Sequence, residues 1–282
     1  MLKLRKIKFN MNKKKSISYI YIVLAIFFVA CSTGKYSDTN KQYHNQAKTF
    51  AKTIRQYPLL DSMDNPSSFV GTTNFNMRKP NFVIIHHTAQ NSCDQTLKTF
   101  TLTRTKVSAH YVICRDGKVY HMLNDYLRAW HAGIGTWGND TDVNSSSIGI
   151  ELDNNGFEVF AEPQINSLII LLKHLKQSYN IPQANFIGHA DIAPTRKNDP
   201  DVYFPWKKLS ENGFGLWYND TSKINVPSNF NDLSALRIVG YNIKDSAAAI
   251  RAFKRHFEQQ DSSSTFNDMD RKILYDIARK NQ

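Results

Sequence analysis

The sequence predicts an α/β fold in which helices flank a mixed central β-sheet, followed by a small C-terminal three-helix domain. Short segments rich in β-branched and aromatic residues alternate with longer helical patterns, as strands and helices do in such folds. These segments are residues 82–86, 110–114, 118–121, 148–152 and 185–188. Near the C-terminus, apolar side chains recur at helical spacing in 233–239, in 246–257 and after Asn267, which is placed to cap the last helix. Amphipathic elements need a second layer to cover them, which favours a sheet with helices on its faces.

The first 30 residues are typical of a signal peptide. Seven basic and no acidic side chains precede an apolar run over 17–30, and those 14 residues are too few to span a bilayer easily. A start at Met1 or at Met11 would each provide a basic beginning. The run ends at Ala30 and Cys31, and small residues before a cysteine resemble a lipoprotein cleavage site. We therefore expect Cys31 to carry a lipid, with ordinary secretion as the alternative.

The net charge of +12 overstates the charge of the exported chain, because seven of the positive charges belong to the signal peptide. The remainder is +5 (12 − 7), which suits an anionic polymer or lipid surface and gives no reason to expect a nucleic acid. After Cys31 only Cys93 and Cys114 remain. Export permits a disulfide between them, and two separate thiols are the alternative.

Composition divides the remaining chain into four parts. Residues 31–70 are polar and predict a tether, and residues 71–210 mix predicted strands with helices and predict the main folded domain. Residues 211–226 are rich in Gly, Asn and Asp and predict a linker, and residues 227–282 form the helical domain. Length is sufficient for one catalytic core and a small additional module.

Two helices and one turn are predicted inside these parts. A short helix is expected near 46–55 of the tether. A longer helix is expected over 163–179, where Pro163 suits the first turn and apolar residues share one face. Residues 115–117, Arg-Asp-Gly, predict a tight turn between two strands.

Candidate metal ligands follow two of the predicted strands. His86 and His87 end one strand, His189 follows another, and Asp199 comes ten residues later. Two imidazoles and a carboxylate from separate segments are what a catalytic zinc site with one open position requires. Side chains alternate across a strand, so only one of His86 and His87 can face a shared metal, and periodicity does not say which. Asp191 is a rival carboxylate, but it is too close to His189 to reach round the metal easily.

Glu151 and Lys197 are the candidate catalytic side chains. Alternation over 148–152 places Glu151 and Gly149 on the face opposite the apolar residues, where a cleft glutamate could move a proton. Lys197 precedes Asp199 by two residues, so an extended loop directs both to one side, and its cation could stabilise an oxyanion. A surface glutamate and a solvated loop lysine are the alternatives.

Six stretches occur in an order that resembles the type 2 N-acetylmuramoyl-L-alanine amidases, a zinc fold shared with peptidoglycan recognition proteins and phage amidase lysozymes. They are Asn74-Phe75-Asn76 and residues 84–89, 108–111, 129–133, 147–152 and 189–200. The resemblance implies one Zn²⁺ held by His86, His189 and Asp199. It also implies that Glu151 shuttles the proton and that Lys197 steadies the oxyanion. The pattern departs at Asp201, where relatives often carry Gly, which affects the expected rim of the cleft.

The resemblance extends to substrate contacts and to the C-terminal helices. It implies that Asn74, His110, Trp130 and His131 line the cleft, with Trp130 in the core as the alternative. Residues 238–257 resemble part of a peptidoglycan-binding three-helix module. A plain helical bundle that packs on the catalytic domain is the alternative.

These observations together predict a monomeric, zinc-dependent amidase of the cell envelope, lipid-anchored in the outer membrane and facing the periplasm. Its expected substrate is the amide between N-acetylmuramic acid and L-alanine in peptidoglycan or muropeptides. A non-catalytic peptidoglycan-binding lipoprotein and a zinc enzyme for another amide are the rival hypotheses. Every predicted catalytic residue precedes residue 210, so loss of 227–282 is expected to spare the hydrolysis of a small muropeptide.

Overall fold

The computed structural model describes residues 34–55, 72–74, 76–259 and 263–281. It divides into two compact units, Met1–Thr73 and Asn74–Gln282. The predicted signal peptide and Cys31 lie outside the described residues. Within the described part, every helix is too short or too polar to cross a bilayer.

Among the described residues of the first unit, 34–55 and 72–73, the chain forms the helix α2 (Ser37–Ile54). It is longer than the short helix expected in the tether, because no Gly or Pro interrupts residues 35–55. None of its residues is buried, so the helix has no apolar core of its own.

The second unit is built on a five-stranded mixed sheet with the strand order β3-β2-β4-β1-β5. The strands are β1 (Phe82–His87), β2 (Tyr111–Ile113), β3 (Val119–His121), β4 (Ser147–Leu152) and β5 (Phe186–Gly188). Pairing is parallel except between β2 and β3, which are antiparallel. The predicted turn joins these two strands, and Gly117 has a φ of 86°, which glycine adopts without strain. The predicted mixed sheet is therefore confirmed.

The remaining helices surround this sheet. The longer ones are α3 (Cys93–Thr101), α5 (Glu162–Tyr179), α8 (Asp232–Val239), α9 (Ser246–Phe257) and α10 (Asp268–Lys280). The short ones are α4 (Val143–Ser146), α6 (His189–Ile192) and α7 (Trp206–Glu211). Asn267 caps α10 through its side chain, as predicted.

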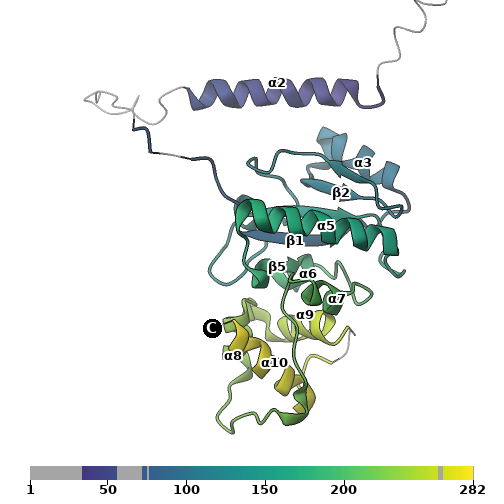
Figure 1. Ribbon diagram of the computed structural model, residues 1–282. Coiled ribbons are helices and arrows are strands. Elements are labelled where there is room, and N and C mark those ends of the chain that lie inside the picture. The colour runs from purple at the N-terminus through teal and green to yellow at the C-terminus, as the bar shows by residue number, and fades with distance from the viewer. Residues whose placement is uncertain (1–33, 56–71, 75, 260–262, 282) are drawn as a thin grey trace, which may run out of the picture. The chain divides into compact units, whose positions relative to one another are not determined.

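Helix α5 covers one face of the sheet. Figure 1 shows it lying along the strands in front of β1. The apolar cluster on this face is formed by alternate strand residues and the inward side of the helix, and includes Val83, Ile85, Ile148, Ile150, Leu168 and Leu172. The predicted pattern of apolar residues in α5 therefore marks its buried side.

The C-terminal helices lie on the other side of the sheet, where Figure 1 shows α8, α9 and α10 beyond β5 and α6. A single apolar cluster joins Ile84 and Ile187 of the sheet to Leu236 of α8, Phe253 of α9 and other residues. The helices and the sheet thus share a core within one compact unit. The sequence predicted that loss of residues 227–282 would spare hydrolysis. Because these helices share a core with the sheet, their deletion would expose buried apolar residues of the sheet such as Ile84.

Candidate active site

The carboxyl ends of three parallel strands bring the predicted site residues together. His86 on β1 is paired with Glu151 on β4, and Ile85 is paired with Gly188 on β5, immediately before His189. Paired residues of parallel strands point to the same face. His86 and Glu151 therefore share the face opposite α5, as the alternation over residues 148–152 predicted for Glu151.

Three side chains meet at this edge. Nδ1 of His86 lies 2.9 Å from Nδ1 of His189, and Oδ2 of Asp199 lies 3.1 Å and 3.0 Å from these two atoms. All three residues are at least 95% buried, and their candidate ligand atoms lie within 4.8 Å of one another. This donor set, two imidazole nitrogens and one carboxylate oxygen, is one that zinc accepts with a further position open.

The outer hydrogen bonds of both imidazoles indicate where their protons are. Nε2 of His189 lies 3.2 Å from the carbonyl oxygen of Ala132, which can only accept, so this nitrogen is the donor. A neutral His189 then presents a lone pair at Nδ1 to His86 and Asp199. Outer partners of this kind orient metal-binding histidines.

A second histidine, His131, fixes the position of the proton on His86 in the same way. Ser147 donates its hydroxyl to the carbonyl of Val143, so its oxygen accepts from Nε2 of His131 at 3.1 Å. Nδ1 of a neutral His131 then accepts from Nε2 of His86 at 3.0 Å. His86 therefore also presents a lone pair at Nδ1. Two lone pairs and a carboxylate converge, an arrangement that a cation would stabilise, so the residues fit a metal ion.

The charge states of the cluster agree with this interpretation. Burial, together with the neighbouring His189, lowers the pKa of His86 to about 4. Burial likewise holds the pKa of His131 well below its usual range. Asp199 is buried as well, and its ionised carboxylate facing two lone pairs would be stabilised by a cation held between them. Neutral imidazoles and an ionised carboxylate are the forms that bind metals.

The two alternative ligands lie elsewhere. The ring of His87 packs against Gly156, where an added Cβ would lie 3.0 Å from its Cε1 atom. The carboxylate of Asp191 bonds Tyr241 and His256 instead of facing the cluster. The geometry thus favours His86 over His87 and Asp199 over Asp191.

Glu151 lies beside His86 on the neighbouring strand. Its Oε2 is buried and has no hydrogen-bond partner among the described residues. Burial, and then the negative charge of Asp199, raise the pKa of Glu151 well above its usual value, while Lys197 acts in the opposite direction. A carboxyl group with a raised pKa is suited to general acid–base catalysis. Lys197 itself is exposed, and its charge also affects His86.

His131, which was predicted to line the cleft, is buried behind His86. It is 8% exposed, and its ring lies beneath Gly149, where an added Cβ would be 2.3 Å from Cγ. Only glycine at position 149 leaves room for this ring, so the close approach of His131 to His86 depends on it.

His110, which was also predicted to line the cleft, is a buried residue bonded to the backbone. His110 is fully buried, its Nδ1 accepts the amide of Gly149 at 3.0 Å, and its Nε2 lies 3.0 Å from the carbonyl of Leu127. Burial lowers its pKa to about 4. Both ring nitrogens are used by the backbone, so the residue is structural.

Trp130 and Asn74 are accessible to a ligand. Trp130 is 54% exposed, which rules out the alternative that it belongs to the core. Asn74 is exposed in the segment that precedes β1. Their substrate contacts stay predictions. Asp201, which stands where relatives often have Gly, has a φ of 72°, a conformation that glycine favours and aspartate tolerates.

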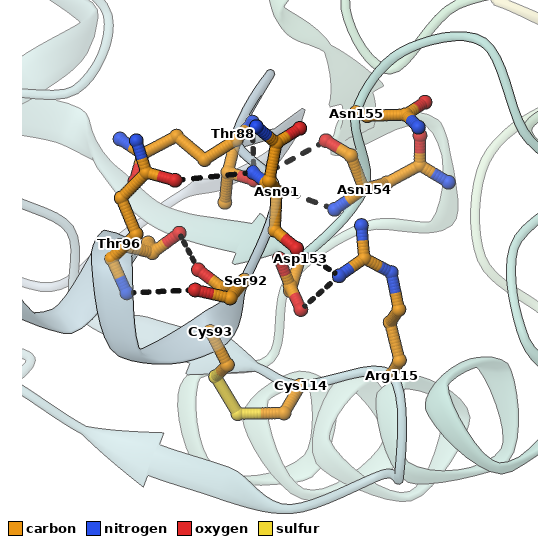
Figure 2. Close-up of polar contacts among 12 residues, drawn as sticks. Thr88, Asn91, Ser92, Cys93, Thr96, Cys114, Arg115, Asp153, Asn154 and Asn155 are labelled. Atoms are coloured by element: carbon orange, nitrogen blue, oxygen red, sulfur yellow. Dashed lines mark hydrogen bonds and ion pairs between the residues drawn. A yellow bond between two sulfur atoms is a disulfide. The ribbon is translucent and has the colours of Figure 1, made fainter.

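A polar network and a disulfide hold the loops around the end of β4 (Figure 2). Cys93 and Cys114 are bonded, which settles the pairing that the sequence left open. Arg115, next to Cys114, donates to Asp153 at 2.9 Å and to the carbonyl of Asn91 at 3.0 Å. Asp153 lies two residues after Glu151, so these bonds help to fix the strand end that carries the predicted proton shuttle.

Fold and site together define the class of a hydrolase with a candidate metal centre. Residues 76–202 match the protein family described as N-acetylmuramoyl-L-alanine amidase. The chain is 36% identical over 207 residues to N-acetylmuramoyl-L-alanine amidase AmiD of Escherichia coli (strain K12), covering 62% of this chain and 74% of that protein. This chain belongs to the N-acetylmuramoyl-L-alanine amidase family and is a hydrolase of amide bonds.

Other relatives agree with this membership. The chain is 38% identical over 104 residues to 1,6-anhydro-N-acetylmuramyl-L-alanine amidase AmpD of Haemophilus influenzae, covering 36% of this chain and 56% of that protein. The structure of E. coli AmiD with the substrate anhydro-N-acetylmuramic acid-L-Ala-D-gamma-Glu-L-Lys has a TM-score of 0.65 and 28% identity, covering 74% of this chain and 93% of that chain. AmpDH3 of Pseudomonas aeruginosa with anhydromuramic pentapeptide has a TM-score of 0.66 and 29% identity, covering 78% and 98%.

Proposed function

We propose that this chain is a zinc-dependent enzyme that hydrolyses the amide between N-acetylmuramic acid and L-alanine in peptidoglycan or its muropeptide fragments. The observation that carries the proposal is the convergence of His86, His189 and Asp199, with Glu151 beside them. Family membership supports the reaction. The substrates named for the AmiD and AmpDH3 structures support the muropeptide class.

The residues of this chain suggest how the amide is cleaved. A zinc ion held by the three ligands supplies polarisation of a carbonyl and a lowered pKa for a water molecule. Glu151 takes a proton from the water that attacks the lactyl carbonyl carbon, and returns it to the nitrogen of L-alanine as the C–N bond breaks. Lys197 offsets negative charge on the carbonyl oxygen. The products are a carboxylic acid on the sugar side and a free amino group on the peptide.

We further propose that the protein is a monomer anchored by a lipid on Cys31 to the outer membrane, facing the periplasm. The basic start, the apolar run over 17–30 and the small residues before Cys31 support this location. We also propose that Trp130 and Asn74 contact the substrate, and that the C-terminal helices bind the cell wall. The exposed ring of Trp130 supports the first of these roles.

Metal removal and product analysis test the proposal together. The soluble fragment 32–282 is incubated with isolated sacculi or muropeptides, and the products are identified by mass spectrometry. A chelator is expected to abolish release of the peptide and added zinc to restore it. Full turnover in a sample shown by elemental analysis to lack zinc would contradict the proposed mechanism. Cleavage of a different amide would support the rival hypothesis of a zinc enzyme for another amide. Binding of sacculi without cleavage would support the rival hypothesis of a non-catalytic peptidoglycan-binding lipoprotein.

A further inference from the structure

The carboxylate of Asp191 joins the candidate metal site to the C-terminal helices. It is 2% exposed and accepts three hydrogen bonds. Oδ2 accepts from the amide of Gly188 and from Nδ1 of His256, both at 2.8 Å, and Oδ1 accepts from the hydroxyl of Tyr241 at 2.7 Å. Tyr241 follows α8 and His256 belongs to α9, and both side chains are buried. Two of the three donors therefore come from the C-terminal region.

Asp191 in turn holds the backbone that carries two of the predicted ligands. His189 is the first residue of α6, and the bond from the Gly188 amide to Asp191 closes the start of this helix. Within α6, the amide of Ala190 donates to the carbonyl of Asp199 at 2.8 Å. The position of α6 therefore affects both His189 and Asp199.

Close packing leaves these donors little freedom. The ring of Trp206 stacks on His256 with centroids 3.9 Å apart and an interplanar angle of 12°. A Cβ on Gly188 would lie 2.9 Å from Cδ of Pro200 and 3.1 Å from Cζ2 of Trp206. The ring of Tyr241 packs edge-on against Trp137 with centroids 5.0 Å apart. Displacing either donor would thus disturb the segment between Gly188 and Pro200.

We propose that Tyr241 and His256 are positioning residues, which act through Asp191 to hold His189 and Asp199 in the geometry that binds metal. The C-terminal helices then support the metal site in addition to covering apolar surface. This inference rests on the proposed function, because it takes the metal ligands from there. The alternative is that the two donors only satisfy a buried carboxylate and contribute to stability alone.

Zinc affinity in single variants of the otherwise unchanged protein separates these possibilities. Tyr241→Phe removes one hydroxyl and is expected to weaken zinc binding about tenfold, measured by competition with a chelator. His256→Asn places an amide donor near the position of Nδ1 and is expected to retain most of the affinity. Tyr275→Phe on α10, whose ring packs on Phe230, is the chemically matched control and should bind zinc as the wild type does.

A stability control and a double variant complete the test. Ile277→Val alters the fully buried core of α10 and removes none of the hydrogen bonds to Asp191, so it should lower thermal stability without changing zinc affinity. In an Asp191→Asn background, Tyr241→Phe should cause no further loss of affinity, because the two residues act as one unit.

Three outcomes would overturn the inference. The first is that Tyr241→Phe binds zinc as tightly as the wild type. The second is that Ile277→Val, at the same loss of stability as Tyr241→Phe, weakens zinc binding as much as Tyr241→Phe does. The third is that the effects of Asp191→Asn and Tyr241→Phe on zinc affinity are fully additive. Absence of zinc binding by the wild-type protein would instead contradict the proposed function, so the two failures are distinguishable.

Discussion

Nε2 of His86 lies 3.0 Å from Nδ1 of His131, so a second histidine stands directly behind a predicted metal ligand. Because Ser147 holds the far side of His131, the chain of hydrogen bonds runs in one direction and leaves the lone pair of His86 at Nδ1. His131 and Ser147 therefore fix the position of the proton on His86, although neither is a predicted metal ligand.

Replacing His131 by Leu is expected to weaken zinc binding about 10- to 100-fold, the usual effect of losing an outer partner of a ligand. His131→Asn keeps a polar atom near Nδ1 and should recover part of the loss. His174→Leu, at an exposed site on α5, is the matched control. Affinities are measured by chelator competition, and unchanged affinity in His131→Leu would show that His86 needs no such support.

The Glu151→Gln variant tests the proton shuttle. It should keep its zinc and its fold but lose about 10²–10⁴ in kcat, the usual contribution of a general acid–base group. Elemental analysis and muropeptide kinetics measure the two properties, with Glu211→Gln at an exposed position as control. Loss of zinc from Glu151→Gln would reassign Glu151 to metal binding.

Replacing Trp130 by Ala should raise KM for muropeptides several-fold and leave the free energy of unfolding within about 0.5 kcal/mol of the wild type, because the side chain is 54% exposed. A core tryptophan would cost about 3–5 kcal/mol on the same replacement. Denaturant titration and steady-state kinetics provide the two measurements. A large loss of stability with an unchanged KM would contradict the proposed substrate contact.

The buried imidazole of His110 should make the free energy of unfolding depend on pH. Its pKa is about 4 in the folded protein, below the ordinary 6.5, so the unfolded chain takes up the proton first as pH falls. The free energy of unfolding should therefore decrease from about pH 6.5 to about pH 4, with His110 contributing at most about 3 kcal/mol.

The metal-free wild type and His110→Asn are compared by denaturant titration across this range. Asparagine can still accept the Gly149 amide but does not titrate, so the variant should show a shallower decline. Equal slopes for the two proteins would exclude His110 as the source of the effect.

Local patterns predicted much of the fold and of the site. Alternation over residues 148–152 placed Glu151 on the correct face, and the apolar spacing of 163–179 identified the buried side of α5, because both periodicities follow from backbone geometry. The same alternation could not choose between His86 and His87. That choice depended on which face of β1 meets α5, a property of packing.

Residue types and their order were enough to indicate a cluster of two imidazoles and a carboxylate, because the ends of parallel strands meet at one edge of a sheet. Tertiary structure alone placed His131 behind His86, bonded Cys93 to Cys114, and brought His256 to Asp191. His131 and His86 are 45 positions apart in the chain, and His256 and Asp191 are 65 apart. Contacts over such separations leave no periodic trace in a sequence, because they arise only when distant elements pack into a shared core.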